Sequence, residues 1–455
     1  MRSDFLTADR DSLYLLPPSV QDWLPDNHLA RFIVDIVTQL DLTPLRDAYA
    51  GRGCKAYDPE MLLALLFYGY ATGIFSSRKL ELATYESIAV RYIAGNSHPD
   101  HDTIANFRKR FLAELKPFFI QILTLAHEMN ILKIGKISID GTKIKANASK
   151  HQALSWGYAS KLEKQLKDEV EFLLRQAELA DQSTIPDGMS IPEELERREK
   201  RLEAIARAKS EIEHRAEERY QKEKAEHEKK LAARERKRQK SKKKPGGKPP
   251  KAPEPGVKDR DQVNLTDEES RIMPVSGGGF LQAYNAQASV DLDTMLIVGV
   301  HVTQNTNDKL EIQPALDELN KLPAKLGKVT EASADAGYFS ETNVGFCEKA
   351  EIIPYIAAGR ESHNQLLADR FSEPESIDKN ADAVTKMKHR LKTKDGKALY
   401  AKRKCTVEPV FGVIKSVLGF RQFLLRGIEN VSGEWDLVSI AWNLKRLHVL
   451  RQITA

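Results

Sequence analysis

Cysteine is scarce in this chain of 455 residues, which contains only Cys54, Cys347 and Cys405. Three cysteines so far apart provide neither a disulfide framework nor a zinc-binding cluster, and they favour a reducing cytoplasm. Long apolar runs are also lacking, because the most apolar stretches, such as 61–70 and 437–441, are too short to cross a bilayer. The first residues lack the apolar core of a signal peptide. We therefore expect neither a membrane-spanning nor a secreted protein.

Charged residues make up 30% of the chain, but one segment accounts for the net charge of +5. Residues 234–251 contain ten lysines and arginines against one acidic residue, so the rest of the chain is slightly acidic. A solvated linker and a nonspecific contact to nucleic-acid phosphates are both compatible with this segment. A case for nucleic-acid binding must therefore rest on where the cations lie in the fold.

The length exceeds what one compact core usually holds, so we expect two or three domains. Helical periodicity dominates the start of the chain: Asp58 precedes one predicted helix, and others are expected at 77–91 and 102–129. These helices are compatible with a helix-turn-helix-like module or a plain bundle. The predicted domains are an all-α N-terminal domain at 1–130, an α/β domain at 131–152 and 260–455, a charged helical hairpin at 153–241, and a disordered basic Pro/Gly-rich linker at 242–259.

Strand periodicity begins near Lys136, where apolar and polar residues alternate through Ala146. Paired strands are expected at 279–291 and 294–303. From residue 308 onwards, predicted helices and short strands alternate, which is typical of an α/β core. We therefore predict a mixed sheet flanked by helices, interrupted after its first strand by the charged hairpin.

Three carboxylates occur where this order of elements would bring them together. Asp140 lies in the first predicted strand, Asp335 follows a short strand at 329–334, and Glu408 lies on a late helix. Sites in open α/β sheets lie at the carboxyl ends of strands. Converging carboxylates suit Mg²⁺ or Mn²⁺, and two such ions about 3.5–4 Å apart can cleave a phosphodiester. Taken singly, the aspartates are also compatible with turns and Glu408 with a solvated helix surface.

Cations flank Glu408 on its predicted helix. Lys404 is four residues before it and Lys415 seven after it, so both would share its face. Arg403 would point elsewhere unless the helix begins after it. Cations in this place suit a site that also holds phosphates, and a salt-bridged surface helix is the alternative.

A cluster between Asn96 and Asp102 combines two histidines and two aspartates at a metal-like spacing. We interpret Asp102 as the N-cap of the following helix. His98 and His101 are interpreted as loop or packing groups rather than as metal ligands.

The motifs around the three carboxylates resemble those of DDE transposases from bacterial insertion sequences. The resemblance rests on Ile139-Asp-Gly-Thr, on Ala334-Asp-Ala-Gly-Tyr, and on Tyr400-x-x-Arg403 followed by Glu408-Pro-Val-Phe-Gly and Lys415. Other similar segments are 58–108, 280–288 and 434–446. Only the charged insertion and linker, roughly 155–260, lie outside the resemblance.

This resemblance implies an RNase H-like core that uses two Mg²⁺ or Mn²⁺ ions. Such an enzyme cuts the ends of its own DNA element and joins them to target DNA. By motif, Asp140, Asp335 and Glu408 would be the catalytic residues and the metal ligands. The residues expected to contact DNA are Lys415, Tyr400, Arg403 and Lys404 near the site, and Arg108, Lys109 and Arg110 on the last helix of the N-terminal DNA-binding domain.

One departure from the family pattern concerns the cation beside Glu408. Related enzymes often have three residues between the arginine and the glutamate, whereas four separate Arg403 from Glu408, and Lys404 has the usual offset. The resemblance therefore leaves both cations as candidates.

The expected partner is double-stranded DNA, bound by a homodimer at the element ends in the bacterial nucleoid. A metal-dependent nuclease without strand transfer and an inactive DNA-binding remnant are the alternatives. The complete set of acids and the uninterrupted reading frame argue against the remnant.

Overall fold

The computed structural model describes residues 19–49, 56–149, 152–180, 191–241, 249–275, 278–359, 373–374, 376–378 and 381–454. The chain forms two compact units. Unit 1 comprises 1–144, 285–423 and 429–455, and unit 2 comprises 145–284 and 424–428.

Unit 1 begins with helices. They are α1 (Val20–Trp23), α2 (Leu29–Val37), α3 (Thr43–Asp47), α4 (Pro59–Thr72), α5 (Ser77–Glu86), α6 (Ile88–Ile93), α7 (His101–Arg110) and α8 (Leu115–Glu128). Asp58 caps α4 by accepting a hydrogen bond from Glu60 N, and Gly73 ends the helix in the left-handed conformation. The two longer helices predicted at 77–91 and 102–129 are each two helices. Ser87 has an extended backbone and is the N-cap of α6, so it separates α6 from α5.

Helix α4 is a core helix, buried from Leu62 through Ala71. In the described part of the chain, no single helix is long and apolar enough to span a membrane. Only α4 and α5 taken together, with a 97° bend between them, meet the test by length and composition.

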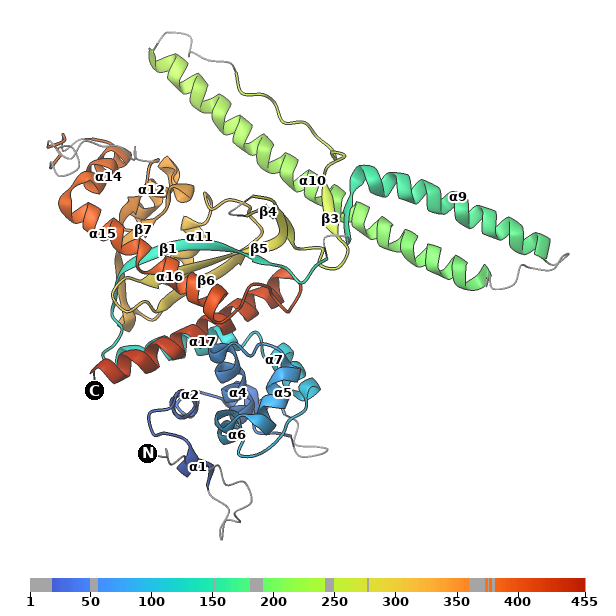
Figure 1. Ribbon diagram of the computed structural model, residues 1–455. Coiled ribbons are helices and arrows are strands. Elements are labelled where there is room, and N and C mark those ends of the chain that lie inside the picture. The colour runs from blue at the N-terminus through green and yellow to red at the C-terminus, as the bar shows by residue number, and fades with distance from the viewer. Residues whose placement is uncertain are drawn as a thin grey trace, which may run out of the picture. The chain divides into compact units, whose positions relative to one another are not determined.

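The sheet of unit 1 follows these helices (Figure 1). Its strands are β1 (Ile134–Lys145), β5 (Phe280–Asp291), β6 (Ile297–Thr303), β7 (Gly327–Ala334) and β8 (Ile353–Ile356), in the order β6-β5-β1-β7-β8. Strands β1, β7 and β8 are parallel, and β6 is antiparallel to β5. Strand β5 also runs antiparallel to β1, because Leu292 N at its end donates to the carbonyl of Lys136 near the start of β1.

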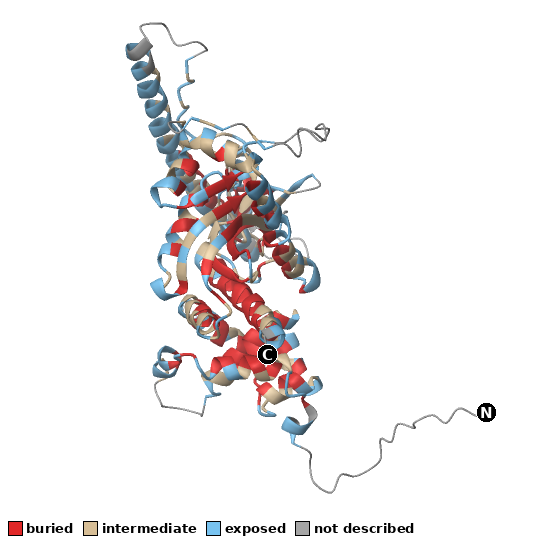
Figure 2. Cartoon of the chain, turned by 90° about the vertical axis from the view of Figure 1, so that its left-hand side faces the viewer, coloured by how far each residue is buried: buried red, intermediate tan, exposed pale blue. Residues whose placement is uncertain are grey.

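Helices pack on this mixed sheet. They are α11 (Ile312–Asn320), α12 (Glu341–Lys349), α14 (Ala383–Lys392), α15 (Lys394–Lys404), α16 (Val407–Gly412) and α17 (Ile428–Thr454). Trp435 and Trp442 of α17 donate to carbonyls of β5 and of the β5–β6 turn, and buried residues (red in Figure 2) line the strands. The mixed sheet flanked by helices is consistent with the predicted RNase H-like core.

The N-terminal helices share a core with α17. Tyr70 Oη of α4 donates to Glu434 Oε1 over 3.1 Å, and Lys445 Nζ contacts the Ala71 carbonyl. Region 1–130 is therefore not a separate compact unit but belongs to the same unit as the sheet.

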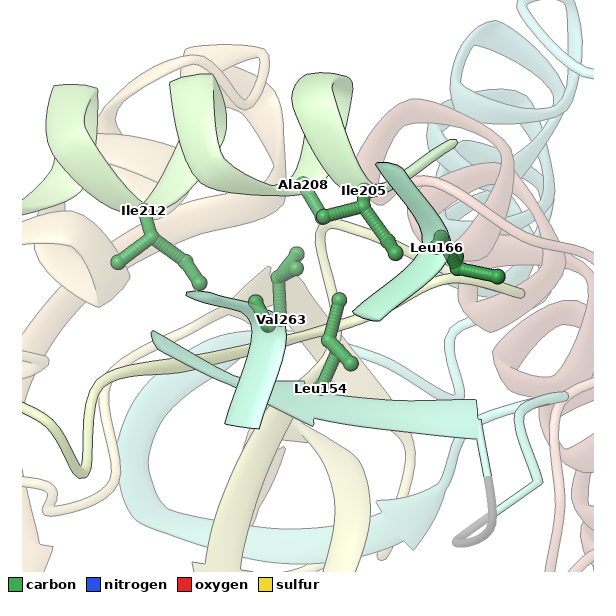
Figure 3. Packing of buried hydrophobic residues seen from close by; sticks show 7 residues of the cluster. Leu154, Leu166, Ile205, Ala208, Ile212 and Val263 are labelled. Atoms are coloured by element: carbon green, nitrogen blue, oxygen red, sulfur yellow. The ribbon is translucent and has the colours of Figure 1, made fainter. Parts of the chain in front are cut away.

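Unit 2 contains the charged insertion, whose two long helices pack against each other. They are α9 (Trp156–Ala180) and α10 (Ile191–Ser241), and the pair of short strands at their base is β2 (Ala153–Ser155) and β3 (Gln262–Asn264). Leu166, Ile205 and Ile212 meet Leu154 and Val263 in a small apolar core (Figure 3). The helices run antiparallel, because the partner on α9 moves toward its start as the position on α10 advances, from Arg198–Glu169 to Lys209–Glu163.

The prediction of a disordered linker at 242–259 is wrong for its second part, which the structure describes. Residues 242–248 lie outside the described residues, but 249–259 form irregular backbone along α10. Arg219 donates to the Gly256 carbonyl and pairs with Asp261, and His227 contacts the Pro250 carbonyl. Strand β4 (Arg271–Pro274) follows and pairs with the first residues of β5.

Candidate active site

Asp140 and Asp335 lie side by side on the two central parallel strands. Ile139 of β1 and Ala334 of β7 are register partners, so the two aspartates follow directly paired residues. Adjacent strands are about 4.8 Å apart, which brings both side chains to one place. Gly141 N donates to Asp140 Oδ1, and Gly337 N donates to Asp335 Oδ1, both over 2.8 Å. The strand order thus joins two carboxylates that are far apart in sequence.

Arg403 connects this pair to the third carboxylate. Its Nη1 lies 3.2 Å from Asp140 Oδ2, and its Nη2 lies 2.9 Å from Glu408 Oε1. A single guanidinium therefore spans the carboxylates of β1 and α16. The Asp140 side chain is 17% exposed and that of Glu408 is 49% exposed, so the site has a covered end and an open end.

The structure places Arg403, and not Lys404, beside the acids. Arg403 was expected to point away unless the helix of Glu408 begins after it, and this condition is met, because α15 ends at Lys404 and α16 begins at Val407. The break at Cys405 and Thr406 turns Arg403 inward, where it is buried, while Lys404 is exposed.

The electrostatics of the site favour an added cation. Burial and the charge of Asp335 raise the pKa of Asp140 to about 7, against the opposing effects of the Gly141 hydrogen bond and Arg403. Buried carboxylates that repel each other are stabilised by a cation. The hard oxygen donors of Asp140, Asp335 and Glu408 thus fit a divalent ion in their chemistry. As placed, however, the described side chains do not gather three His, Cys, Asp or Glu groups around one metal position.

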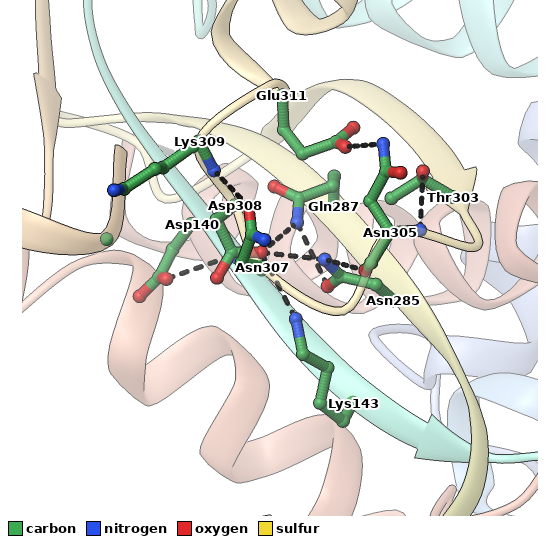
Figure 4. A network of polar contacts seen from close by, with 12 residues as sticks. Asp140, Lys143, Asn285, Gln287, Thr303, Asn305, Asn307, Asp308, Lys309 and Glu311 are labelled. Atoms are coloured by element: carbon green, nitrogen blue, oxygen red, sulfur yellow. Dashed lines mark hydrogen bonds and ion pairs between the residues drawn. The ribbon is translucent and has the colours of Figure 1, made fainter. Parts of the chain in front are cut away.

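A polar network that was missed from the sequence lies behind Asp140 (Figure 4). Asp308, in the loop after β6, accepts at Oδ1 from Lys143 Nζ at 3.2 Å, Asn285 Nδ2 at 2.7 Å and Gln287 Nε2 at 2.8 Å. The available signal was the spacing of Asn285 and Gln287, two residues apart in a predicted strand, which puts two amides on one face.

Gly141 packs directly against this network. A Cβ at this position would lie 2.1 Å from Gln287 Nε2 and 2.9 Å from Asp308 Oδ1. Hydrogen bonds hold both groups, so neither can move away without losing a partner.

Replacing Gly141 by alanine should therefore reduce the free energy of unfolding by about 1–3 kcal/mol, the usual cost of overpacking, and displace Asp140. Gly135→Ala is the matched control, because it lies on the same strand and a Cβ there meets nothing within 4 Å. Denaturant unfolding of the two variants measures the difference. Equal stability would show that the Gly141 contact is not restrictive.

Lys415 lies on a π-helical turn, Val413–Val417, that follows α16. Two further cations, Lys143 and Arg421, lie near its side chain. Its Nζ donates to the Lys143 carbonyl over 3.0 Å, and its own carbonyl accepts from Arg421 Nε over 2.9 Å. Burial, with the charges of Lys143 and Arg421, lowers the pKa of Lys415. This crowding of positive charge suits an anionic ligand.

Tyr400 lies beside Arg403, whose guanidinium carbon is 5.7 Å from the centre of its ring. Burial raises the pKa of its phenol, which keeps the group protonated. Tyr400 thus supports the orientation of Arg403.

Arg108 is not available as a phosphate contact. It is buried, and its Nη1 donates to Tyr70 Oη at 3.0 Å and to the Phe75 carbonyl at 3.1 Å. The expectation failed because Arg108 lies on the inner face of α7. Lys109 is exposed, and Arg110 is exposed and lies over the ring of Tyr49.

The histidine cluster has packing roles. His98 stacks on Tyr85 and contacts Thr84 Oγ1, and His101 pairs with Glu81. Asp100, rather than Asp102, caps α7 by accepting from Thr103 N, so the N-cap lies two residues earlier than predicted.

Two family models match the chain. A transposase domain (DUF772) matches residues 18–110, and a transposase DDE domain matches residues 373–448, which include Arg403, Glu408 and Lys415. Nothing among the curated proteins or the solved structures matches. In the sequence, one matched segment precedes the strand that carries Asp140, and the other follows the strand before Asp335. Both matches are to transposase domains, and together with the motifs they support a DDE transposase of the insertion-sequence type.

Proposed function

We propose that this transposase binds the ends of its own DNA element, cleaves them, and joins the freed 3′-hydroxyl ends to target DNA at one site. The observation that carries the proposal is the meeting of Asp140 and Asp335 on paired strands, with Arg403 linking Asp140 to Glu408. Such a group of acids can hold the metal ions that phosphodiester chemistry requires.

Asp140, Asp335 and Glu408 would hold two Mg²⁺ or Mn²⁺ ions. When bound, these ions supply an activated water for cleavage and charge stabilisation at the leaving oxygen. Arg403 keeps Asp140 and Glu408 oriented and balances part of their charge. Cleavage by a metal-activated water needs no protein nucleophile, so no covalent protein–DNA intermediate through Tyr400 is expected.

Lys415 is proposed to hold the phosphate of the cleaved strand, together with the neighbouring charges of Lys143 and Arg421. The half-buried position limits the motion of Lys415, and its ammonium lies at the backbone of β1, three residues along from Asp140. Three residues of strand span about 10 Å, which is within reach of the same DNA strand.

Lys415→Gln should weaken binding of element-end DNA and lower the slope of log affinity against log salt by about 0.9, as expected for one lost phosphate contact. Lys325→Gln is the matched control, because Lys325 is exposed and precedes β7, at the opposite end of that strand from Asp335. Fluorescence anisotropy at several salt concentrations measures both slopes. Equal slopes for the wild type and Lys415→Gln would remove Lys415 from the DNA-binding residues.

The N-terminal helices are proposed to recognise the element ends, with Lys109 and Arg110 as the remaining phosphate contacts of α7. A homodimer holding two ends and an association with the nucleoid complete the proposal.

The deciding experiment incubates the purified protein with labelled element ends, target DNA and Mg²⁺. Site-specific cleavage followed by joined products supports transposition. Cleavage without joining would instead indicate a nuclease, and no cleavage would refute the proposal.

A further inference from the structure

Gln287 is a buried amide in β5 that contacts both Gly141, next to Asp140, and Tyr338, in the turn that begins at Asp335. Its Oε1 accepts from Tyr338 Oη, and its Nε2 donates to Asn285 Oδ1 at 3.0 Å and to Asp308 Oδ1 at 2.8 Å. Tyr338 closes the short turn that begins at Asp335. The Gln287 side chain thus has every polar atom engaged.

The same amide contacts the backbone beside Asp140. Gly141 packs so closely against Gln287 that a methyl group cannot fit between them. Gly141 N in turn donates to Asp140 Oδ1. One side chain therefore sets the position of the residue that orients Asp140 and of the turn that carries Asp335.

A network of this kind is costly in a sheet interior. Gln287 and Asn285 are completely buried, and a buried amide destabilises the fold unless its hydrogen bonds are complete. Asp308 adds a carboxylate that needs Lys143 as its ion-pair partner. An apolar side chain would fill the volume at less cost, so the polar atoms point to a role beyond packing.

We propose that Gln287, supported by Asp308, is a positioning residue that holds Asp140 and Asp335 at the separation needed to share a divalent cation. This inference rests on the proposed function of the site. Completed hydrogen bonds to neighbouring groups orient metal ligands, and their loss typically lowers metal affinity about tenfold to a hundredfold.

The test is a calorimetric titration of Mn²⁺ into the full-length protein without DNA, with thermal unfolding of each metal-free variant measured in parallel. Gln287→Leu removes the whole link, and Tyr338→Phe removes only the hydroxyl that reaches it from the Asp335 turn. Both should lower Mn²⁺ affinity by at least about tenfold. Asp308→Asn keeps an oxygen acceptor and should bind Mn²⁺ better than Asp308→Ala.

Ser289→Ala is the matched control, since Ser289 is also buried on the same face of β5, two residues after Gln287. Its Mn²⁺ affinity should equal that of the wild type. Lower thermal stability with unchanged Mn²⁺ affinity in Tyr338→Phe and the Asp308 variants would overturn the positioning role, even if Gln287→Leu did not fold. Absence of Mn²⁺ binding by the wild type would instead overturn the metal-dependent function on which the inference rests.

Discussion

Replacing Asp140 or Asp335 by asparagine, or Glu408 by glutamine, should reduce cleavage of element ends by at least about a hundredfold. Outer groups that only orient metal ligands already account for about 10–100-fold, so loss of a ligand itself should exceed that range. A neutral amide is a much poorer ligand for Mg²⁺ than a carboxylate. Single-turnover cleavage of labelled ends in Mg²⁺ measures the effect.

DNA binding by these three variants should stay close to that of the wild type, because the cations near the site are unchanged. Asp293→Asn is a suitable control, since this exposed carboxylate pairs with Lys402 on the neighbouring surface. Undiminished cleavage by any one of the three site variants would exclude that residue from catalysis. A trapped protein–DNA adduct through Tyr400 would overturn the whole assignment.

Arg108→Ala should lower the free energy of unfolding of unit 1 by about 3 kcal/mol, the usual consequence of removing one partner from a buried charged network. Arg108 supports Tyr70, which donates to the completely buried Glu434 of α17. Without the guanidinium, the buried Tyr70 hydroxyl, which donates to Glu434, would lose the donor that it accepts from. Urea denaturation followed by tryptophan fluorescence reports on this region through Trp435 and Trp442.

Lys109→Ala serves as the comparison, because Lys109 is the exposed neighbour on the same helix. Its stability should be unchanged, while its affinity for DNA should fall. If Arg108→Ala unfolded like the wild type and yet bound DNA less tightly, Arg108 would be a DNA contact after all.

Much of the site was predictable because its signals are local. The apolar alternation around Asp140 predicts a strand, and the segment 329–334 before Asp335 was predicted as another, short one. Capping residues such as Asp58 mark helix starts within one turn. Together with the family motifs, these patterns were enough to select Asp140, Asp335 and Glu408.

The break between α15 and α16 decided the position of Arg403, whereas the sequence left both Arg403 and Lys404 as candidates. Counting at helical spacing treated 404–415 as one continuous helix, although Pro409, a residue tolerated in the first turn of a helix, indicates a break before it. Only the packing of α15 and α16 turns Arg403 toward the acids.

The sequence by itself determined which residues have the chemistry for metal and phosphate binding and which strands and helices carry them. The tertiary structure alone decided that Arg108 is buried against Tyr70 and that Gln287 joins Gly141, Asp308 and Tyr338. The physical reason is the distance along the chain over which each kind of interaction acts. Periodicity and caps act over a few residues, whereas these contacts join elements far apart in sequence and exist only once the sheet and α17 have packed.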